Sequence, residues 1–173
     1  MSQTTNNLTN IFSDIQQKVS DLIQAYHKLD LQLVTAESCT GGMLGSIITS
    51  VSGASKIYAG GFITYSNQLK IQCLAVPLKM LQCDGAVSYN VAEAMALGAL
   101  KKCKHANVSI ALTGIAGPDG ATPNKPIGLV YISVAKMHPL MNKTTSYVFA
   151  GDRNQIQQAA CYQALTLLFS IIN

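Results

Sequence analysis

The stretch L-Q-L-V-T-A-E-S-C-T-G-G, residues 31–42, decides the fold of this chain. Its apolar first half predicts a short buried strand at 31–35, and the two glycines at its end open a helix expected from about Gly42 to Val51. A strand that passes through a tight turn into a helix is the repeating unit of α/β domains. We therefore expect further strands beside this one and helices over the sheet.

The flanking segments continue the alternation of helix and strand. Apolar residues recur at helical spacing from about Ile11 to Lys28, and we expect the polar residues 1–9 to form a flexible N-terminus. Further strands are expected at 57–65, 108–112, 129–135 and 144–149, and further helices near Lys70, at 89–104 and at 153–172. The order α, β, α, β, α, α, β, β, β, α predicts one α/β domain over residues 10–173, a three-layer α/β/α sandwich with a mixed sheet.

The composition is that of a folded, weakly charged protein. Of the 173 residues, 49% are hydrophobic and only 12% are charged, about half the usual charged share. This composition excludes a disordered chain and suggests that another subunit covers part of the surface, so we expect a homo-oligomer. The net charge is +4, and the one basic cluster, Lys101, Lys102 and Lys104, falls at a predicted helix end, where cations are favoured. We therefore expect no nucleic-acid partner.

Cysteine usage and the N-terminus indicate a cytoplasmic protein. Five cysteines, at positions 39, 73, 83, 103 and 161, are an odd number without C-x-x-C spacing. They predict reduced, mostly buried thiols, and we expect no disulfide framework, no metal and no cofactor. The first residues, M-S-Q-T-T-N-N, lack the basic and apolar regions of a signal peptide. No apolar run is long enough to span a bilayer, so we expect no membrane partner.

The first candidate site is the turn that follows the strand at 31–35. Ser38 places a hydroxyl at a strand-to-helix junction, and Thr40, Gly41 and Gly42 follow it at the helix start. Unpaired N–H groups and the positive end of the helix dipole suit such a start to a phosphate or a developing oxyanion. An ordinary helix N-cap explains the same residues equally well.

Lys70 is the candidate base. It closes the segment Y-S-N-Q-L-K that begins at Tyr65, where a strand ends and a short helix begins. The helix dipole and burial would both lower the pKa of a lysine in the first helical turn, and a neutral amine can take a proton from a serine. A solvent-exposed lysine is the alternative interpretation.

The other candidates for nucleophile or base are weaker. His27, His105 and His138 lie near predicted helix ends or in a turn, and no neighbouring residue would orient them for a serine–histidine pair. Cys39 is a rival nucleophile because a thiolate is more reactive than a hydroxyl. It too lacks a histidine partner, so Ser38 is preferred and Cys39 is expected to be buried.

Two further segments are candidates for binding a ligand. T-G-I-A-G-P-D-G, residues 113–120, follows a predicted strand, and ligands collect at the carboxyl ends of strands in open α/β sheets. Its candidate contacts are Thr113, Gly114, Ala116 and Gly117. Arg153 begins the last helix, where its guanidinium could pair with a phosphate or a carboxylate. A plain surface loop and a surface arginine are the alternatives.

Six motifs that follow one another along the chain together indicate a resemblance to a known protein family, which no single segment shows. They are T-A-E-S-C-T-G-G (35–42), G-G-F-I-T-Y-S-N-x-x-K (60–70), G-A-V-S (85–88), A-L-T-G-I-A-G-P-x-G (111–120), K-P-I-G (125–128) and G-D-R (151–153). Over about residues 10–170 the chain closely resembles the C-terminal domain of CinA proteins, the nicotinamide-nucleotide amidohydrolases. Nothing in it corresponds to the additional N-terminal domain of the larger CinA proteins, so it looks like the stand-alone deamidase form.

The resemblance implies an α/β fold, frequent oligomers and a specific reaction. The family hydrolyses nicotinamide mononucleotide (NMN) to nicotinate mononucleotide and ammonia, which salvages pyridine nucleotides. Its nucleophilic serine matches Ser38, its tyrosine and lysine match Tyr65 and Lys70, and the arginine of its G-D-R segment matches Arg153. We therefore expect a hydrolase with NMN as its small-molecule partner.

The implied mechanism is a hypothesis in which several groups have open roles. Ser38 attacks the carboxamide while Lys70 takes its proton, and Tyr65 relays that proton or orients the amine. The oxyanion is expected on N–H groups of 38–42 or of 113–117, and the phosphate at the same early turn or on the arginine of the last helix. The alternative function is a non-catalytic nucleotide-binding module, or a partner-binding module related to competence or DNA damage.

Overall fold

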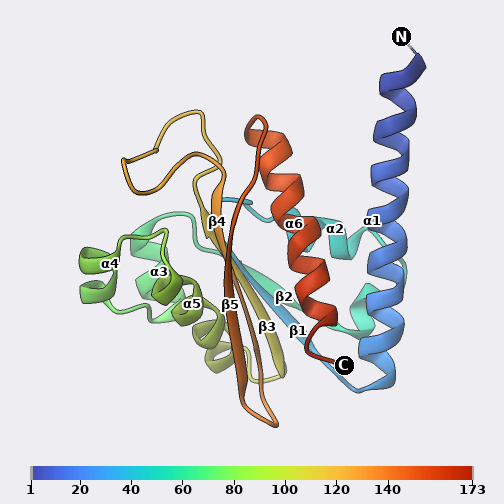
Figure 1. Cartoon of the computed structure of the whole chain (residues 1–173). Helices are drawn as coiled ribbons and strands as arrows, with labels where there is room; N and C mark the ends of the chain where they lie inside the picture. The colour runs from blue at the N-terminus through green and yellow to red at the C-terminus, as the bar shows by residue number, and fades with distance from the viewer. Residues whose placement is uncertain (1, 173) are drawn as a thin grey trace.

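A twisted five-stranded sheet lies between two layers of helices (Figure 1). The computed structural model describes residues 2–172, and it describes side chains over 14–172. In chain order the elements are α1 (Ser2–Lys28), β1 (Leu33–Glu37), α2 (Met43–Thr49), a 3-10 turn (Ala54–Lys56), β2 (Tyr58–Ile63), α3 (Asn67–Leu74), α4 (Leu78–Asp84), α5 (Tyr89–Lys102), β3 (Val108–Gly114), β4 (Leu129–Lys136), β5 (Met141–Val148) and α6 (Arg153–Phe169).

The order of the strands places a crevice at the end of β1. The strands lie in the order β2-β1-β3-β4-β5. β1 is parallel to both β2 and β3, while β4 and β5 continue the sheet in antiparallel fashion, so the predicted mixed sheet is confirmed. The chain leaves β1 for β2 on one side and later enters β3 on the other side. Ligands bind at the carboxyl ends of strands where the connections diverge in this way.

Side chains along the strands alternate between the two faces of the sheet, and helices cover both faces. Val108, Ile110 and Leu112 of β3 belong to the apolar cluster that contains the buried faces of α1, α2 and α6. Ala111 belongs to the opposite cluster, which contains α5 and the buried residues of α3 and α4. On this second face Ser109 donates a hydrogen bond to the carbonyl of Ala96 in α5, so its buried hydroxyl is satisfied. The predicted three-layer α/β/α sandwich is confirmed.

Some boundaries differ from the sequence-based expectation. α1 begins at Ser2 and not near Ile11, so the predicted start of this helix is too late. The division into a flexible segment, 1–9, and a domain, 10–173, stays a prediction, and its first and last residues lie outside the described residues. α4 was not expected because Pro77 suggested an interruption, whereas a proline fits at a helix start and is the N-cap here. Over residues 2–172, no helix is both long and apolar enough for a bilayer span.

Candidate active site

A buried carboxylate organises the turn between β1 and α2. Glu37, the last residue of β1, is 1% exposed. Its carboxylate oxygens accept hydrogen bonds from the backbone N–H groups of Gly42 (3.1 Å), Leu44 (3.0 Å) and Gly45 (2.9 Å) and from the hydroxyl of Thr40 (2.7 Å). A negative charge at a helix N-terminus also interacts favourably with the helix dipole. Glu37 therefore fixes the path of the chain on either side of Ser38.

This arrangement changes the role expected for the start of α2. The N–H group of Gly41 donates to the carbonyl of Ser38, and Glu37 already takes the N–H group of Gly42 and the hydroxyl of Thr40. None of the three residues lines the cavity described below. Gly42 has a φ of +98°, and a Cβ there would lie 2.8 Å from the Ile63 side chain. The expectation that residues 40–42 hold a phosphate or an oxyanion stays a prediction, and the Thr40 hydroxyl and the N–H groups of Gly41 and Gly42 already take part in the turn.

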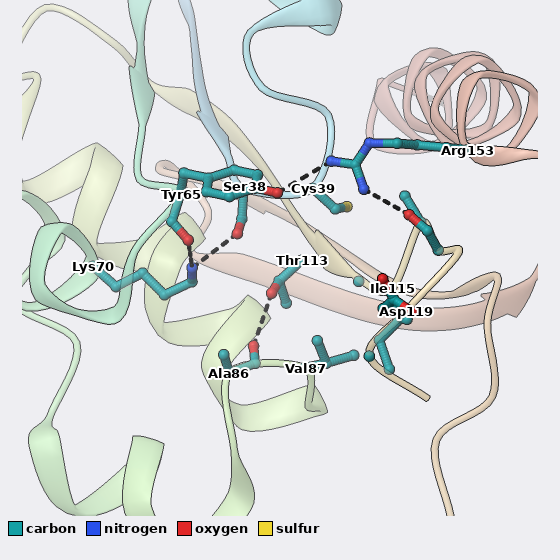
Figure 2. Close-up of a pocket in the computed structure, with 14 residues that line it drawn as sticks. Ser38, Cys39, Tyr65, Lys70, Ala86, Val87, Thr113, Ile115, Asp119 and Arg153 are labelled. Carbon is teal, nitrogen blue, oxygen red and sulfur yellow. Dashed lines mark hydrogen bonds between the residues drawn. The ribbon is translucent and has the colours of Figure 1, made fainter. Parts of the chain in front are cut away.

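Ser38 and Lys70 meet in the core of the site. The Nζ atom of Lys70 lies 2.8 Å from Ser38 Oγ, 2.8 Å from the carbonyl oxygen of Thr64 and 3.3 Å from the carbonyl oxygen of Tyr65 (Figure 2). The lysine is carried by α3, whose first turn is capped by the hydroxyl of Ser66. Lys70 is 1% exposed, so the exposed lysine considered as an alternative is wrong.

The surroundings of Lys70 make its amine easier to deprotonate than that of an exposed lysine. Burial away from water lowers the pKa of Lys70 from 10.5 to about 8. A neutral amine has two N–H donors and one lone pair. The carbonyl oxygens of Thr64 and Tyr65 can accept the two donors, and the lone pair then faces the hydroxyl of Ser38. This geometry can activate a serine hydroxyl as a nucleophile.

Cys39 is next to Ser38 in sequence but is itself a poor nucleophile. Its side chain is buried, and burial raises the pKa of the thiol to about 12. Very little of it is therefore thiolate near neutral pH. Its carbonyl accepts a hydrogen bond from Gln157 of α6 (2.7 Å), while its N–H group donates to no backbone carbonyl and to no other described residue. Cys39 thus offers the site a backbone donor beside Ser38.

A cavity of about 230 Å³ opens in front of this pair (Figure 2). It is lined by Ser38, Cys39, Tyr65, Lys70, Ala86, Val87, Thr113, Gly114, Ile115, Ala116, Gly117, Asp119, Gly120 and Arg153. The structure therefore brings together all the residues singled out by the sequence except those of the α2 start. Thr113 donates its hydroxyl to the carbonyl of Ala86 (2.8 Å), which leaves the oxygen lone pairs of Thr113 available as acceptors.

Tyr65 and Arg153 form the mouth of the cavity. The Nη2 group of Arg153 donates to the Tyr65 hydroxyl (3.1 Å), and Nη1 donates to the carbonyl of Gly117 (2.8 Å). Figure 2 shows the Tyr65 ring reaching toward the guanidinium and away from Lys70. Only the backbone carbonyl of Tyr65 contacts Lys70 Nζ. The phenol is therefore not placed to relay a proton to Lys70, and a role of Tyr65 in orienting the amine stays a prediction.

Several functional positions escaped the sequence reasoning. Glu37 lies inside the first motif, yet nothing in its spacing shows that it caps α2. Ala86 and Val87 belong to the G-A-V-S motif and Asp119 to the loop after β3, and all three line the cavity. Membership in a shared motif was the signal that could have found them. Within the described part of the chain, no group of three or more His, Cys, Asp or Glu side chains is placed to bind a metal ion.

Comparison with known proteins identifies the family of this chain. The model of the CinA C-terminal domain matches residues 14–172. The chain belongs to this family. CinA-like proteins from Citrifermentans bemidjiense and Trichodesmium erythraeum are 38% and 46% identical to it over 91% and 79% of this chain. These matches cover 38% and 32% of the two relatives, so the chain spans about a third of their length.

Solved structures of the family share the fold closely. A competence-damaged protein (CinA) superfamily protein from Escherichia coli has a TM-score of 0.86 and 37% identity, covering 91% of this chain and 90% of that one. A competence/damage inducible protein from Agrobacterium tumefaciens has a TM-score of 0.86 and 35% identity, covering 92% of this chain and 96% of that one. The CinA-type α/β fold of this chain is thus shared along nearly the whole of both proteins.

Proposed function

We propose that this chain hydrolyses the carboxamide of NMN to nicotinate mononucleotide and ammonia, with Ser38 as nucleophile and Lys70 as general base. The 2.8 Å approach of a buried lysine amine to a serine hydroxyl carries the proposal. A buried lysine with no carboxylate partner among the described residues is costly for stability, so its position favours a chemical role. The choice of NMN follows from the resemblance to the nicotinamide-nucleotide amidohydrolases, and Arg153 at the cavity mouth suits a phosphate.

The reaction proceeds through a covalent ester. Lys70 takes the proton of Ser38 as the oxygen attacks the carboxamide carbon. The same amine then gives the proton to the departing nitrogen, which leaves as ammonia. In the second half, water attacks the ester and gives a proton to Lys70, which returns a proton to Ser38 as the acid is released. One buried amine thus serves as base and acid in turn.

Backbone donors beside the nucleophile suit the developing oxyanion. The N–H group of Cys39 follows Ser38 directly and donates to no backbone carbonyl and to no other described residue. A donor held in place before the reaction stabilises the charge that appears on the carbonyl oxygen. The N–H group of Ser38 is not available, because it donates to the carbonyl of Leu112 in β3. We therefore assign the oxyanion to Cys39 N–H and to the cavity-lining backbone of the loop after β3.

Release of ammonia from NMN tests this function. The wild-type chain is incubated with NMN, and ammonia and nicotinate mononucleotide are measured together. Ser38→Ala should lower turnover by at least about 10⁴-fold, because it removes the nucleophile. Cys39→Ala should retain most of the turnover, because alanine keeps the backbone N–H group. Thermal unfolding of both variants checks that the fold is kept.

The outcomes separate the possible assignments. Loss of activity in Cys39→Ala with activity retained in Ser38→Ala would make the thiol the nucleophile. Binding of NMN by the wild type without release of ammonia would leave a nucleotide-binding module in place of an enzyme.

A further inference from the structure

Asp119 is the one carboxylate among the residues that line the cavity. Its side chain is exposed, and it has neither a hydrogen-bond nor an ion-pair partner within residues 14–172. Figure 2 shows Lys70 on one side of the cavity, with Asp119 and Arg153 on the other. The proposed mechanism gives Asp119 no role. An unpaired negative charge at the entrance of a site that must also admit a phosphate requires an explanation.

The loop that carries Asp119 is anchored on both sides of it. Before it, the carbonyl of Gly117 accepts a hydrogen bond from Arg153. After it, Thr122 and Lys125 exchange two backbone hydrogen bonds, and the Lys125 ammonium donates to the carbonyl of Asp84 at the end of α4. The carboxylate is therefore held at the cavity by fixed backbone on either side. A group held in this way can contribute to recognition without a large ordering cost.

We propose that Asp119 is a specificity-determining residue, which favours carboxamides attached to a cationic ring over those attached to a neutral ring. The inference rests on the proposed function and defines its substrate class. The pyridinium ring of NMN carries a permanent positive charge next to the carboxamide, and its phosphate carries negative charge at the other end. A cavity with a serine–lysine pair inside and one carboxylate and one guanidinium farther out is complementary to this charge distribution.

The expected effect is modest because Asp119 is exposed to water. Charge pairs at exposed positions typically contribute up to about a fivefold change in an equilibrium constant. Removal of the Asp119 charge should therefore weaken binding of a cationic-ring nucleotide by about two- to fivefold. Binding of a nucleotide with the same ribose, phosphate and carboxamide but a neutral ring should stay the same.

The test compares NMN with its reduced 1,4-dihydro form, whose ring is uncharged. Both are titrated by calorimetry into Ser38→Ala, which cannot turn them over, and into Ser38→Ala with Asp119→Asn. Asp30→Asn in the same background is the matched control, because it removes an exposed aspartate at the other end of β1. The proposal expects a loss of affinity for NMN alone, and only in the Asp119 variant.

The remaining results overturn the proposal in distinguishable ways. Equal weakening of both nucleotides would assign Asp119 to the ribose or to loop structure. An unchanged affinity for both, or no binding of either nucleotide, would leave Asp119 without a role in recognition. Because the readout is binding, it is separate from the ammonia assay, and failure of the hydrolysis proposal would not be mistaken for failure of this one.

Discussion

Two glycine-rich segments leave the sheet at the carboxyl ends of neighbouring strands. One directs its backbone donors into the protein, and the other lines the cavity. The turn after β1, residues 37–45, directs its helix-start donors inward to the Glu37 carboxylate. The loop after β3, residues 115–128, lines much of the cavity together with the end of that strand. The sequence suggests an anion site in both. The two segments differ because the first contains a single buried carboxylate. It accepts hydrogen bonds from the donors at the helix start, so these donors are not free to bind a ligand.

Under the proposed function, the first segment serves the chemical step and the second serves binding of the substrate. The first segment presents Ser38 from a rigid turn, against Lys70 of α3. The second contributes backbone and Asp119, and it accepts the guanidinium of Arg153 at Gly117. Changes around the first segment should therefore affect the rate of the chemical step or the fold. Changes around the second should affect binding of the nucleotide.

The largest expected effect comes from Lys70. Lys70→Met keeps the length of the side chain and removes the base, so kcat/KM for NMN should fall by about 10³-fold. Lys79→Met, which removes an exposed lysine of α4, is the control and should leave the rate unchanged. Ammonia release measures both. If Lys70→Met retained more than about a tenth of the activity, the chemical role of the first segment would be refuted.

The next effect concerns stability and pH. The unfolded chain keeps its lysine proton up to about pH 10.5, whereas folded Lys70 loses it near pH 8. The unfolded state therefore binds more protons between these values, and stability rises with pH through this window. The unfolding free energy of the wild type relative to Lys70→Met should rise by about 3 kcal/mol between pH 7 and pH 10.5. Denaturant unfolding at several pH values measures this, and a flat difference would show that folding does not lower the pKa of Lys70.

Glu37 gives the clearest contrast between the two segments. Glu37→Gln turns an NH₂ group toward donors that need an acceptor, and it should lower the unfolding free energy by about 2 kcal/mol. Asp119→Asn makes the same chemical change in the second segment, where the carboxylate has no partner, and should change stability by less than about 0.5 kcal/mol. Urea unfolding compares the two. Similar losses of unfolding free energy in both variants would contradict the proposed difference between the two segments.

Substitution of Arg153 should have the smallest effect, and this effect should be on KM. Arg153→Met removes the guanidinium at the cavity mouth, so KM for NMN should rise about tenfold with little change in kcat. Nicotinamide riboside lacks the phosphate, and its kcat/KM should respond much less. A drop in kcat for both compounds would instead place Arg153 in the chemical step.

The sequence predicted most of the fold because its elements are marked locally. Apolar runs and alternating patterns predicted the five strands, and Ser88 and Asp152, whose residue types favour the position, are helix N-caps. The boundaries were less accurate, since β3 continues two residues past Leu112 to Gly114. The short helix after Pro77 was missed because a proline signals a helix start as well as a break.

The site was predicted in part, for a different reason. Ser38, Lys70 and Arg153 were found through their motifs, yet their contacts join residues far apart in sequence. Arg153 meets the hydroxyl of Tyr65 across 88 positions, and no local pattern shows this. The role of Glu37 likewise depends on where its side chain turns, which spacing does not reveal.

Trapping the covalent intermediate tests the central claim most directly. Wild-type protein is mixed with NMN, quenched in acid within one turnover and digested, and the peptide masses are measured. The Ser38–Lys70 mechanism predicts a nicotinate-mononucleotide ester on Ser38, absent in Ser38→Ala and unaffected by Cys39→Ala. An adduct on Cys39, or turnover at full rate in Ser38→Ala, would contradict it.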